Sequence, residues 1–382
     1  MKKALETLLQ LAIGVALGVC LIKFGGSSSG NSSVNPVVDI ILLLVAVVIA
    51  IYLQIIVHEA GHLVCGLLTG YRFVSFRIGS ITLLKDGNGK LHFKRFKLAG
   101  TGGQCLMSPP TNVPLENIPT ALYNAGGALT NMLCAIGALL LLKYCGGMHI
   151  GLRYFLADTM AIGLVFALLN GIPMKWGGIA NDGHNLLYLK RDKQSVKGFA
   201  TLLIINEKLQ NGTRLSQMPD NLFDLGADIN YSDPMQANVG LNGISRELDK
   251  GNIELAHEQF NEVIQRHGSE LLPLYKTEAL SELTFTNLAT GNYEAARALL
   301  ADKMLMKYIT KHARVMSSKQ RVLMAKALLL DNDRAQAERL YNEVIDHRDS
   351  YVFQGEVEND IELMKNLLET QNVEQNQVNS SN

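Results

Sequence analysis

Two long apolar segments without charged side chains constrain the fold of this chain more than any other feature. Residues 40–57 form an uncharged run of 18 residues, and residues 117–142 form one of 26. At a helical rise of about 1.5 Å per residue, each run crosses or nearly crosses a hydrocarbon core of about 30 Å. With two shorter apolar runs, they predict an α-helical multi-pass membrane protein of about four spans. We expect these spans near residues 5–23, 37–68, 117–142 and 152–174.

The charges divide the chain into two unlike halves, although the net charge is zero. Residues 1–200 carry 17 Lys and Arg against 8 Asp and Glu, whereas residues 201–382 carry 18 against 27. A basic, apolar half joined to an acidic, polar half excludes one uniform globular domain, and zero net charge argues against a nucleic-acid partner. The five scattered cysteines match neither a disulfide scaffold nor a Cys-x-x-Cys zinc site, so we expect free thiols.

The distribution of Lys and Arg predicts the orientation in the bilayer. Residues 25–36 contain no basic side chain, whereas residues 72–97 contain seven. By the positive-inside rule, the N-terminus, the 72–97 loop and the chain after about residue 175 lie in the cytosol. The first apolar run also fits a cleaved signal peptide, but no small-x-small cleavage site follows it, so we predict a retained helix.

The motif His-Glu-Ala-Gly-His at residues 58–62 ends the second apolar segment. Residues four apart share a helix face, so His58 and His62 can both bind one Zn²⁺, with Glu59 beside the metal. There the ion activates a water molecule, and a carboxylate takes the proton and returns it to the leaving nitrogen. The alternative is a satisfied polar cluster. Such side chains are costly inside a bilayer and functional there by default, which favours the metal site.

A catalytic zinc site of this kind has three protein ligands and one open position. Two candidates for the third ligand, Asp182 and His184, follow the fourth apolar segment. A buried Asp is expected to be paired or metal-bound. Asp182 is equally well explained as a helix cap before the apolar residues 185–189. The sequence therefore leaves the third ligand open.

Three motifs in a fixed order resemble the site-2 protease family of intramembrane zinc metalloproteases, the M50-type peptidases. The zinc-helix motif at residues 58–62 is followed by Gly-Gly-Ala-Leu-Thr-Asn at 126–131, which resembles the family's A-G-P-L-A-N stretch. Asn-Gly-Ile-Pro at 170–173 and Asp-Gly at 182–183 then resemble its N-x-x-P…D-G pattern. The resemblance covers about residues 37–190.

This resemblance implies a zinc ion held by His58, His62 and Asp182, with His184 as the alternative third ligand. Glu59 is then the catalytic carboxylate. The implied activity is that of a zinc metalloendopeptidase. It also implies a location in a cell membrane, which we expect to be a bacterial plasma membrane.

Two asparagines, Asn131 and Asn170, are implied to line the cleft and to hold the substrate backbone or the developing oxyanion. The chain departs from the family pattern at two places. Ala128 stands where the family has Pro, and eight residues, 174–181, separate the Pro from the Asp-Gly pair. The first departure predicts altered helix geometry rather than altered chemistry. For Asn131, plain packing between membrane helices is the alternative role.

The loop at residues 71–98 reads as a β-hairpin. Alternating apolar and polar residues flank Asp-Gly-Asn-Gly at 86–89, which is a strong turn signal. A protease must hold its substrate in an extended form, and a sheet edge does so by strand addition. A basic hairpin lying on anionic lipid headgroups explains the same residues equally well.

The C-terminal half contains a loose internal repeat with an offset of 40 residues. Gly-Asn-Ile-Glu-Leu-Ala at 251–256 returns as Gly-Asn-Tyr-Glu-Ala-Ala at 291–296, and more loosely at 331–335. Such paired amphipathic helices resemble tetratricopeptide repeats, which stack and leave a groove for a protein partner. A helical domain that only packs on itself is the alternative. We expect a membrane domain at 1–200, a linker at 201–235, the helical domain at 236–370 and a disordered tail at 371–382.

The sequence thus predicts an intramembrane zinc endopeptidase that cleaves membrane-embedded or membrane-adjacent segments, in regulated intramembrane proteolysis or peptide maturation. The main rival is a catalytically silent membrane scaffold that binds client proteins, but such a protein has no need of Glu59. A second rival is a prenyl-protein protease, whose third ligand is a Glu on a later helix. No Glu lies between Glu116 and Glu207, which disfavours that class.

Overall fold

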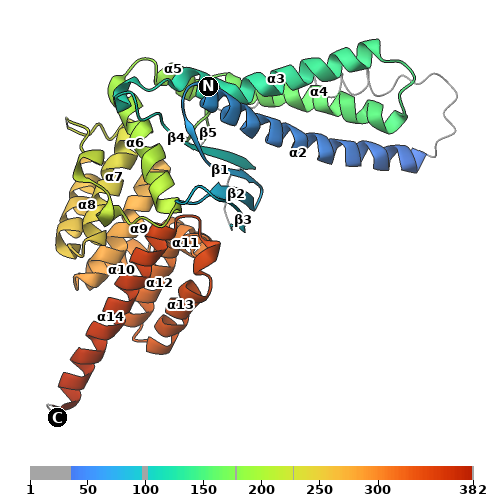
Figure 1. The fold of residues 1–382 in the computed structure, drawn as a ribbon. Helices are drawn as coiled ribbons and strands as arrows, with labels where there is room; N and C mark the ends of the chain where they lie inside the picture. The colour runs from blue at the N-terminus through green and yellow to red at the C-terminus, as the bar shows by residue number, and fades with distance from the viewer. Residues whose placement is uncertain (1–35, 97–101, 177–178, 227, 381–382) are drawn as a thin grey trace. The chain divides into compact units, whose positions relative to one another are not determined.

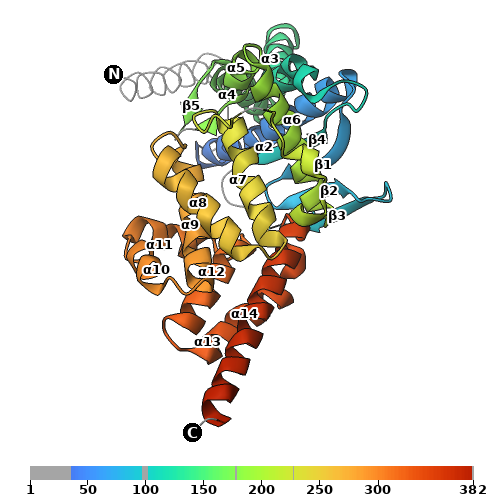
Figure 2. The same cartoon turned by 90° about the vertical axis from the view of Figure 1, so that its left-hand side faces the viewer.

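The computed structural model describes residues 36–96, 102–176, 179–226 and 228–380, and it consists mainly of helices (Figures 1 and 2). It divides into two compact units. Unit 1 comprises Met1–Ile78, Gly102–Cys105 and Pro119–Arg191, and unit 2 comprises Gly79–Thr101, Leu106–Ile118 and Asp192–Asn382.

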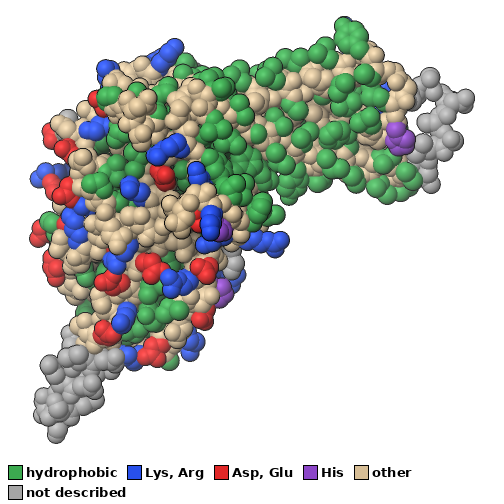
Figure 3. All heavy atoms as spheres, viewed as in Figure 1, with side chains coloured by type: hydrophobic (Ala, Val, Ile, Leu, Met, Phe, Trp, Pro, Cys, Tyr) green, Lys and Arg blue, Asp and Glu red, His purple; other side chains and the backbone are tan. Residues whose placement is uncertain are grey.

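Three long apolar helices form the frame of unit 1. They are α2 (Pro36–Leu68), α3 (Thr120–Tyr144) and α4 (Ile150–Gly171), and each packs against the other two. All three are long and apolar enough to cross a membrane. Their outward faces are covered with aliphatic side chains, seen as a green surface in Figure 3. Three of the four expected spans therefore correspond to helices, and the first, at 5–23, lies outside the described residues.

Small residues allow α2 and α3 to approach backbone to backbone. A Cβ atom added to Gly61 would collide with the Gly126 carbonyl group, and one added to Gly126 would collide with that of Gly61. The Thr130 hydroxyl, one turn further along α3, donates a hydrogen bond of 2.9 Å to the Val57 carbonyl oxygen of α2. Close packing of small residues with a polar contact beside it is typical of helices that associate in lipid.

Two short strands lie in the eight-residue segment between Pro173 and Asp182. They are β5 (Lys175–Trp176) and β6 (Ile179–Ala180), which pair antiparallel. The short helix α5 (Asp182–Tyr188) follows and packs against α3 and α4. Gly183 makes a close approach possible here, because a Cβ atom at this position would overlap the Gly171 carbonyl group at the end of α4.

Four strands form a small sheet in the order β3-β2-β1-β4. They are β1 (Arg72–Ile78), β2 (Ile81–Lys85), β3 (Leu91–Arg95) and β4 (Gly103–Ser108). β2 and β3 form the expected antiparallel hairpin, with Ile81 opposite Arg95. In its turn, the Asp86 carboxylate accepts hydrogen bonds from the Asn88 and Lys90 backbone N–H groups, at 2.9 and 2.8 Å. This is the turn that Asp-Gly-Asn-Gly predicts.

Unit 2 is a stack of helices in which neighbours along the chain pack side by side (Figure 2). Its α-helices are α6 (Lys193–Gln210), α7 (Pro234–Asp249), α8 (Ile253–His267), α9 (Pro273–Ala289), α10 (Tyr293–Leu300), α11 (Lys303–His312), α12 (Ser317–Leu329), α13 (Arg334–Asp346) and α14 (Gln354–Ser380). One continuous apolar core joins α7 through α12 and includes the fully buried Phe260 and Phe285.

The 40-residue repeat corresponds to a recurring turn between two helices. Gly251 separates α7 from α8 with φ +84°, Gly291 separates α9 from α10 with φ +77°, and Asn332 separates α12 from α13 with φ +51°. This left-handed conformation suits Gly and is tolerated by Asn. The repeat thus encodes a helix–turn–helix unit, and its kinship with tetratricopeptide repeats stays a prediction.

Two stretches carry more regular structure than we expect from the sequence. Within 201–235, α6 runs to Gln210 and the following turns bury Leu215, Met218 and Leu222 against it. Turn-forming residues therefore do not make this stretch an extended linker. At the C-terminal end, α14 continues to Ser380, into the stretch expected to be disordered.

Candidate metal centre

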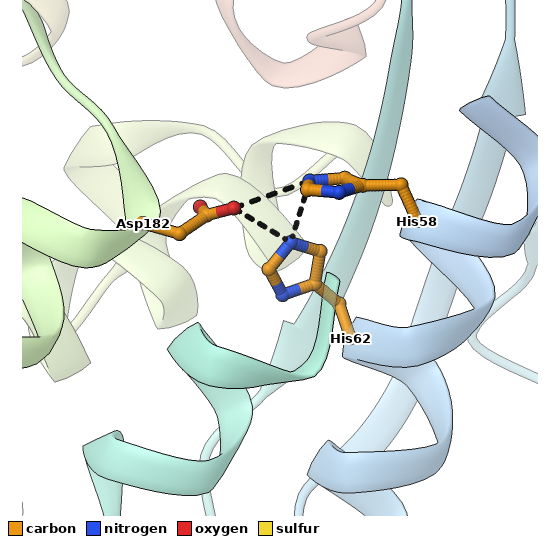
Figure 4. Close-up of side chains that lie close together, drawn as sticks. All are labelled: His58, His62 and Asp182. Atoms are coloured by element: carbon orange, nitrogen blue, oxygen red, sulfur yellow. Dashed lines mark hydrogen bonds and ion pairs between the residues drawn. The ribbon is translucent and has the colours of Figure 1, made fainter. Parts of the chain in front are cut away.

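Three side chains that could bind a metal ion converge in unit 1 (Figure 4). His58 and His62 project from one face of α2, and Asp182 projects toward them from the first turn of α5. The two histidine Nε2 atoms lie 3.2 Å apart. One carboxylate oxygen of Asp182, Oδ2, lies 3.1 Å from Nε2 of His58 and 3.3 Å from Nε2 of His62. The three atoms form a nearly equilateral triangle.

This triangle has the dimensions of one face of a zinc coordination tetrahedron. Zinc binds imidazole nitrogen and carboxylate oxygen at about 2.0–2.2 Å, so neighbouring ligand atoms in a tetrahedral site lie about 3.3 Å apart. Two imidazoles and one carboxylate also form a donor set that zinc enzymes use. The residues therefore fit a zinc ion with three protein ligands.

Hydrogen bonds to the Nδ1 atoms hold both histidine rings so that their Nε2 atoms face the candidate metal position. Nδ1 of His58 lies 2.7 Å from Oδ1 of Asn131, and Nδ1 of His62 lies 2.8 Å from the backbone oxygen of Tyr123. Both partners are acceptors, so each Nδ1 carries a proton, which leaves each Nε2 as the atom available to a metal ion. Metal-binding histidines are commonly oriented in this way. Gly127 provides the space, because a Cβ atom there would overlap the His58 ring.

The orientation of Asn131 follows from its second hydrogen bond. Its Nδ2 donates 2.8 Å to the backbone oxygen of Gln54, which can only accept, so Oδ1 must be the atom that faces His58. The same Nδ2 donates 2.6 Å to Oε1 of Gln54, whose Nε2 donates 2.9 Å to the Thr159 backbone oxygen. A buried chain of hydrogen bonds thus joins α2, α3 and α4 behind the metal site.

Asp182 is free to face the histidines because its neighbour caps the helix. The N-cap of α5 is Asn181, whose Oδ1 accepts from the His184 backbone N–H at 2.9 Å and from that of Met174 at 3.0 Å. Burial tends to raise the pKa of Asp182, but its contacts with the two imidazoles outweigh this and lower the pKa to about 2. The carboxyl group is therefore an anion throughout the neutral range.

Glu59 follows His58 on α2 and is 8% exposed. Gly103, at the start of β4, lies against it. A Cβ atom on Gly103 would come within 2.7 Å of Cγ and Oε1 of Glu59, so only glycine leaves this space open. A buried cation, Arg77 on β1, interacts electrostatically with Glu59 and donates a hydrogen bond of 3.3 Å to the Gly103 carbonyl oxygen. The carboxylate that the sequence analysis singled out thus points from α2 toward the first residue of β4.

One comparison with known proteins identifies the family. The model for peptidase family M50 matches residues 46–345, well over half of the chain. The chain belongs to peptidase family M50. Members of this family, the site-2 proteases, are metallopeptidases and generally use zinc. No curated protein and no solved structure gives a match.

The site residues that we predicted from the sequence of this M50 peptidase fall into two groups in the structure. His58, His62 and Asp182 come together, and Asn131 contacts His58 from behind. His184 is not part of the metal-binding group found in the described residues, and its ring stacks on Tyr188 with centroids 5.3 Å apart. The amide of Asn170 donates 3.0 Å to the Phe166 backbone oxygen of its own helix. The substrate-binding roles of Asn131 and Asn170 stay predictions.

Gln54 is a residue of the site that the sequence analysis did not identify. It is fully buried and stands one turn before His58 on the same face of α2. The available signal was its polarity, since it is the one amide in the uncharged run at 40–57.

We expect Gln54→Leu to weaken zinc binding by about tenfold, the lower end of the usual cost of losing a group that supports a metal ligand. Leu leaves the backbone acceptor of residue 54 in place but removes the Oε1 acceptor, so the Asn131 amide that orients His58 loses one of its two supports. Competition with a chromophoric chelator measures the affinity. Thr130→Val is the matched control, because it removes another buried hydrogen bond between α2 and α3 but leaves His58 held. Equal zinc affinities in the two variants would contradict a positioning role for Gln54.

Proposed function

We propose that this M50 peptidase is an intramembrane zinc endopeptidase that cleaves membrane-embedded or membrane-adjacent segments of proteins or peptides. The observation that carries the proposal is the convergence of His58, His62 and Asp182 within an apolar helix bundle. Ionisable side chains at such positions are costly in lipid and are functional there by default. Regulated intramembrane proteolysis and peptide maturation are the two processes that such an activity serves.

The residues divide the chemistry between them. When bound, zinc supplies a Lewis acid that activates water and polarises the scissile carbonyl group. Glu59 takes a proton from the attacking water and delivers it to the leaving nitrogen. Asp182 contributes a negative charge that offsets part of the charge of the cation. The buried Arg77 places a positive charge near Glu59, and Asn131 keeps His58 in the tautomer that binds metal.

Strand β4 supports a way of holding the substrate. It lies at one edge of the sheet, and its first residue, Gly103, contacts Glu59. An extended substrate segment added at this edge would place its backbone near the catalytic carboxylate, and a peptide bond must leave its helix before it is cut. The hairpin β2–β3 suits the other role considered for this region. Phe93 is 77% exposed and has basic neighbours, which favours contact with anionic headgroups.

We further propose a bacterial plasma membrane as the location, with the N-terminus and the C-terminal domain in the cytosol. The seven basic residues at 72–97 support this orientation. A catalytically silent scaffold is the alternative function, and the two differ in whether new chain ends are made.

The test compares membranes from cells that contain either the wild-type chain or a His58→Ala variant, with chain ends identified by mass spectrometry. We expect the wild type to generate new termini inside or next to apolar segments, and the variant to accumulate the uncut precursors. Identical sets of termini in the two membranes would favour the scaffold.

A further inference from the structure

A cavity of about 440 Å³ lies inside unit 2, between helices α6, α7, α9, α12 and α14. Its lining includes apolar side chains, among them Leu241, Leu248 and Phe353. It also includes asparagine amides from α6, α7 and α14, and carboxylates from α9 and α14. All of these residues are far from the metal site in the sequence, and none of them takes part in the chemistry proposed above.

The charges around the cavity do not balance. Four carboxylates line it, and two cations on α12 lie among them. Lys319 contacts Glu278 at 2.6 Å and Glu282 at 3.4 Å. Arg321 pairs with Glu282 and, at 2.7 Å, with Asp360. The fourth carboxylate is Glu356. The two cations thus pair with three of the four carboxylates, and Glu356 is the one left without an ion pair.

Glu356 is the carboxylate that has no partner. Within the residues that the structure describes, its side chain makes no hydrogen bond and no ion pair, although it faces the cavity. Burial raises the pKa of Glu356 to about 8. The neighbouring carboxylates act in the same direction, and the charge of Lys319 opposes them only in part. An ionised carboxylate held in such a place is costly unless a cation accompanies it. The cavity can therefore accept a cation beside Glu356.

The amides around the cavity match the groups of a polypeptide backbone. An asparagine side chain offers two N–H donors and a carbonyl acceptor, as a peptide group requires. The amide of Asn206 on α6 makes no hydrogen bond with any described residue. Asn242 on α7 uses its Nδ2 within its own helix, at 2.9 Å from the Asn238 backbone oxygen, so its Oδ1 stays available to accept. The apolar lining residues suit the aliphatic stem of Lys or Arg.

We propose that this cavity binds an extended polypeptide segment through one lysine or arginine side chain, whose cationic head pairs with Glu356. The unpaired carboxylate of Glu356 supports the cationic head, and the free hydrogen-bonding groups of Asn206 and Asn242 support the backbone beside it. Stacked helix pairs commonly bind peptides in such a groove. The site is independent of the peptidase activity, since no residue of the metal centre takes part in it.

The test measures binding of two acetylated, amidated peptide libraries to the full-length protein in detergent. Both have four random residues on either side of a fixed central residue, which is Lys in one library and the uncharged norleucine in the other. We expect the Lys library to bind about 10–100-fold more tightly, as for a charge-assisted hydrogen bond. Equal affinities would overturn the proposal. Displacement of the bound library by lysine amide at equal affinity would also overturn it, because the backbone contacts would then contribute nothing.

Glu356→Gln should abolish the preference for Lys without lowering the thermal stability, because Glu356 has no internal partner to lose. Glu358→Gln, on the same helix but outside the cavity, is the matched control and should keep the preference. A drop in Tm for Glu356→Gln with an unchanged preference would mean that Glu356 serves the fold, which would contradict the proposed site.

The affinity for the Lys library should also depend on pH. A cation favours ionised Glu356, so binding should tighten about tenfold between pH 7 and pH 9 and release one proton. The charged and titratable groups that face Glu356 are Glu278, Glu282, Lys319, Arg321, Asp360 and Tyr275. Asp360, with its pKa raised to about 6 by burial, titrates below this window. A pH dependence that persists in Glu356→Gln would assign it to another group and contradict the proposal.

Discussion

Glu59→Gln is expected to abolish peptide-bond cleavage while the protein keeps one zinc ion per chain. The amide has nearly the same size and fills the same space beside Gly103, but it cannot take a proton from water. A positioned general acid–base group contributes about 10²–10⁴-fold to the rate, so cleavage should fall by at least that factor. The measurements are the initial cleavage rate of a precursor protein in proteoliposomes and the zinc content of the same preparation.

The matched control for this variant is Glu254→Gln, an exposed carboxylate on α8 in unit 2. It should retain both zinc and activity. Cleavage at the wild-type rate by Glu59→Gln, with zinc bound, would contradict the proposed role of Glu59. Loss of zinc from Glu59→Gln would instead indicate that Glu59 supports metal binding.

Asp182→Ala is expected to lose zinc, whereas His184→Ala keeps it. Asp182 supplies one corner of the ligand triangle and the only negative charge in it. Loss of a ligand should cost more than loss of a group that only orients one, so we expect an affinity drop above about 100-fold. The His184 ring stacks on Tyr188 and takes no part in the group. Zinc content after dialysis, measured by mass spectrometry of the metal, separates the two variants.

The fold of Asp182→Ala must be intact for this comparison to be informative. Asn181, which remains, caps α5, so the helix should persist. Circular dichroism of both variants provides the check. Zinc retained by Asp182→Ala and lost by His184→Ala would reverse the assignment and make His184 the third ligand.

The parts of the metal site that depend on helical spacing could be predicted from the sequence. His58 and His62 lie four apart in an uninterrupted apolar helix, so their convergence follows from the helix itself. The role of Asp182 could not be predicted in this way, because it depends on which residue caps α5. Asn181 and Asp182 are both good caps, and the hydrogen bonds that join the Asn181 side chain to Leu169, Ile172 and Met174 decide between them.

Contacts between distant segments account for the features that the sequence did not predict. Gln54 reaches Asn131 and Thr159, which are 77 and 105 residues away, so its role appears only once three helices are packed. The cavity of unit 2 depends likewise on α9, α12 and α14 meeting. The 40-residue repeat locates the turns at Gly251 and Gly291, because a glycine with positive φ is a local requirement. It carries no information about which carboxylate is left without a partner.

Anomalous X-ray scattering at the zinc absorption edge, recorded from crystals of active protein, tests the central claim most directly. We predict one peak about 2.0–2.2 Å from Nε2 of His58, Nε2 of His62 and a carboxylate oxygen of Asp182. The peak should persist in Glu59→Gln and disappear in Asp182→Ala. An active protein with no peak among these three side chains, or with its zinc bound elsewhere, would contradict the account.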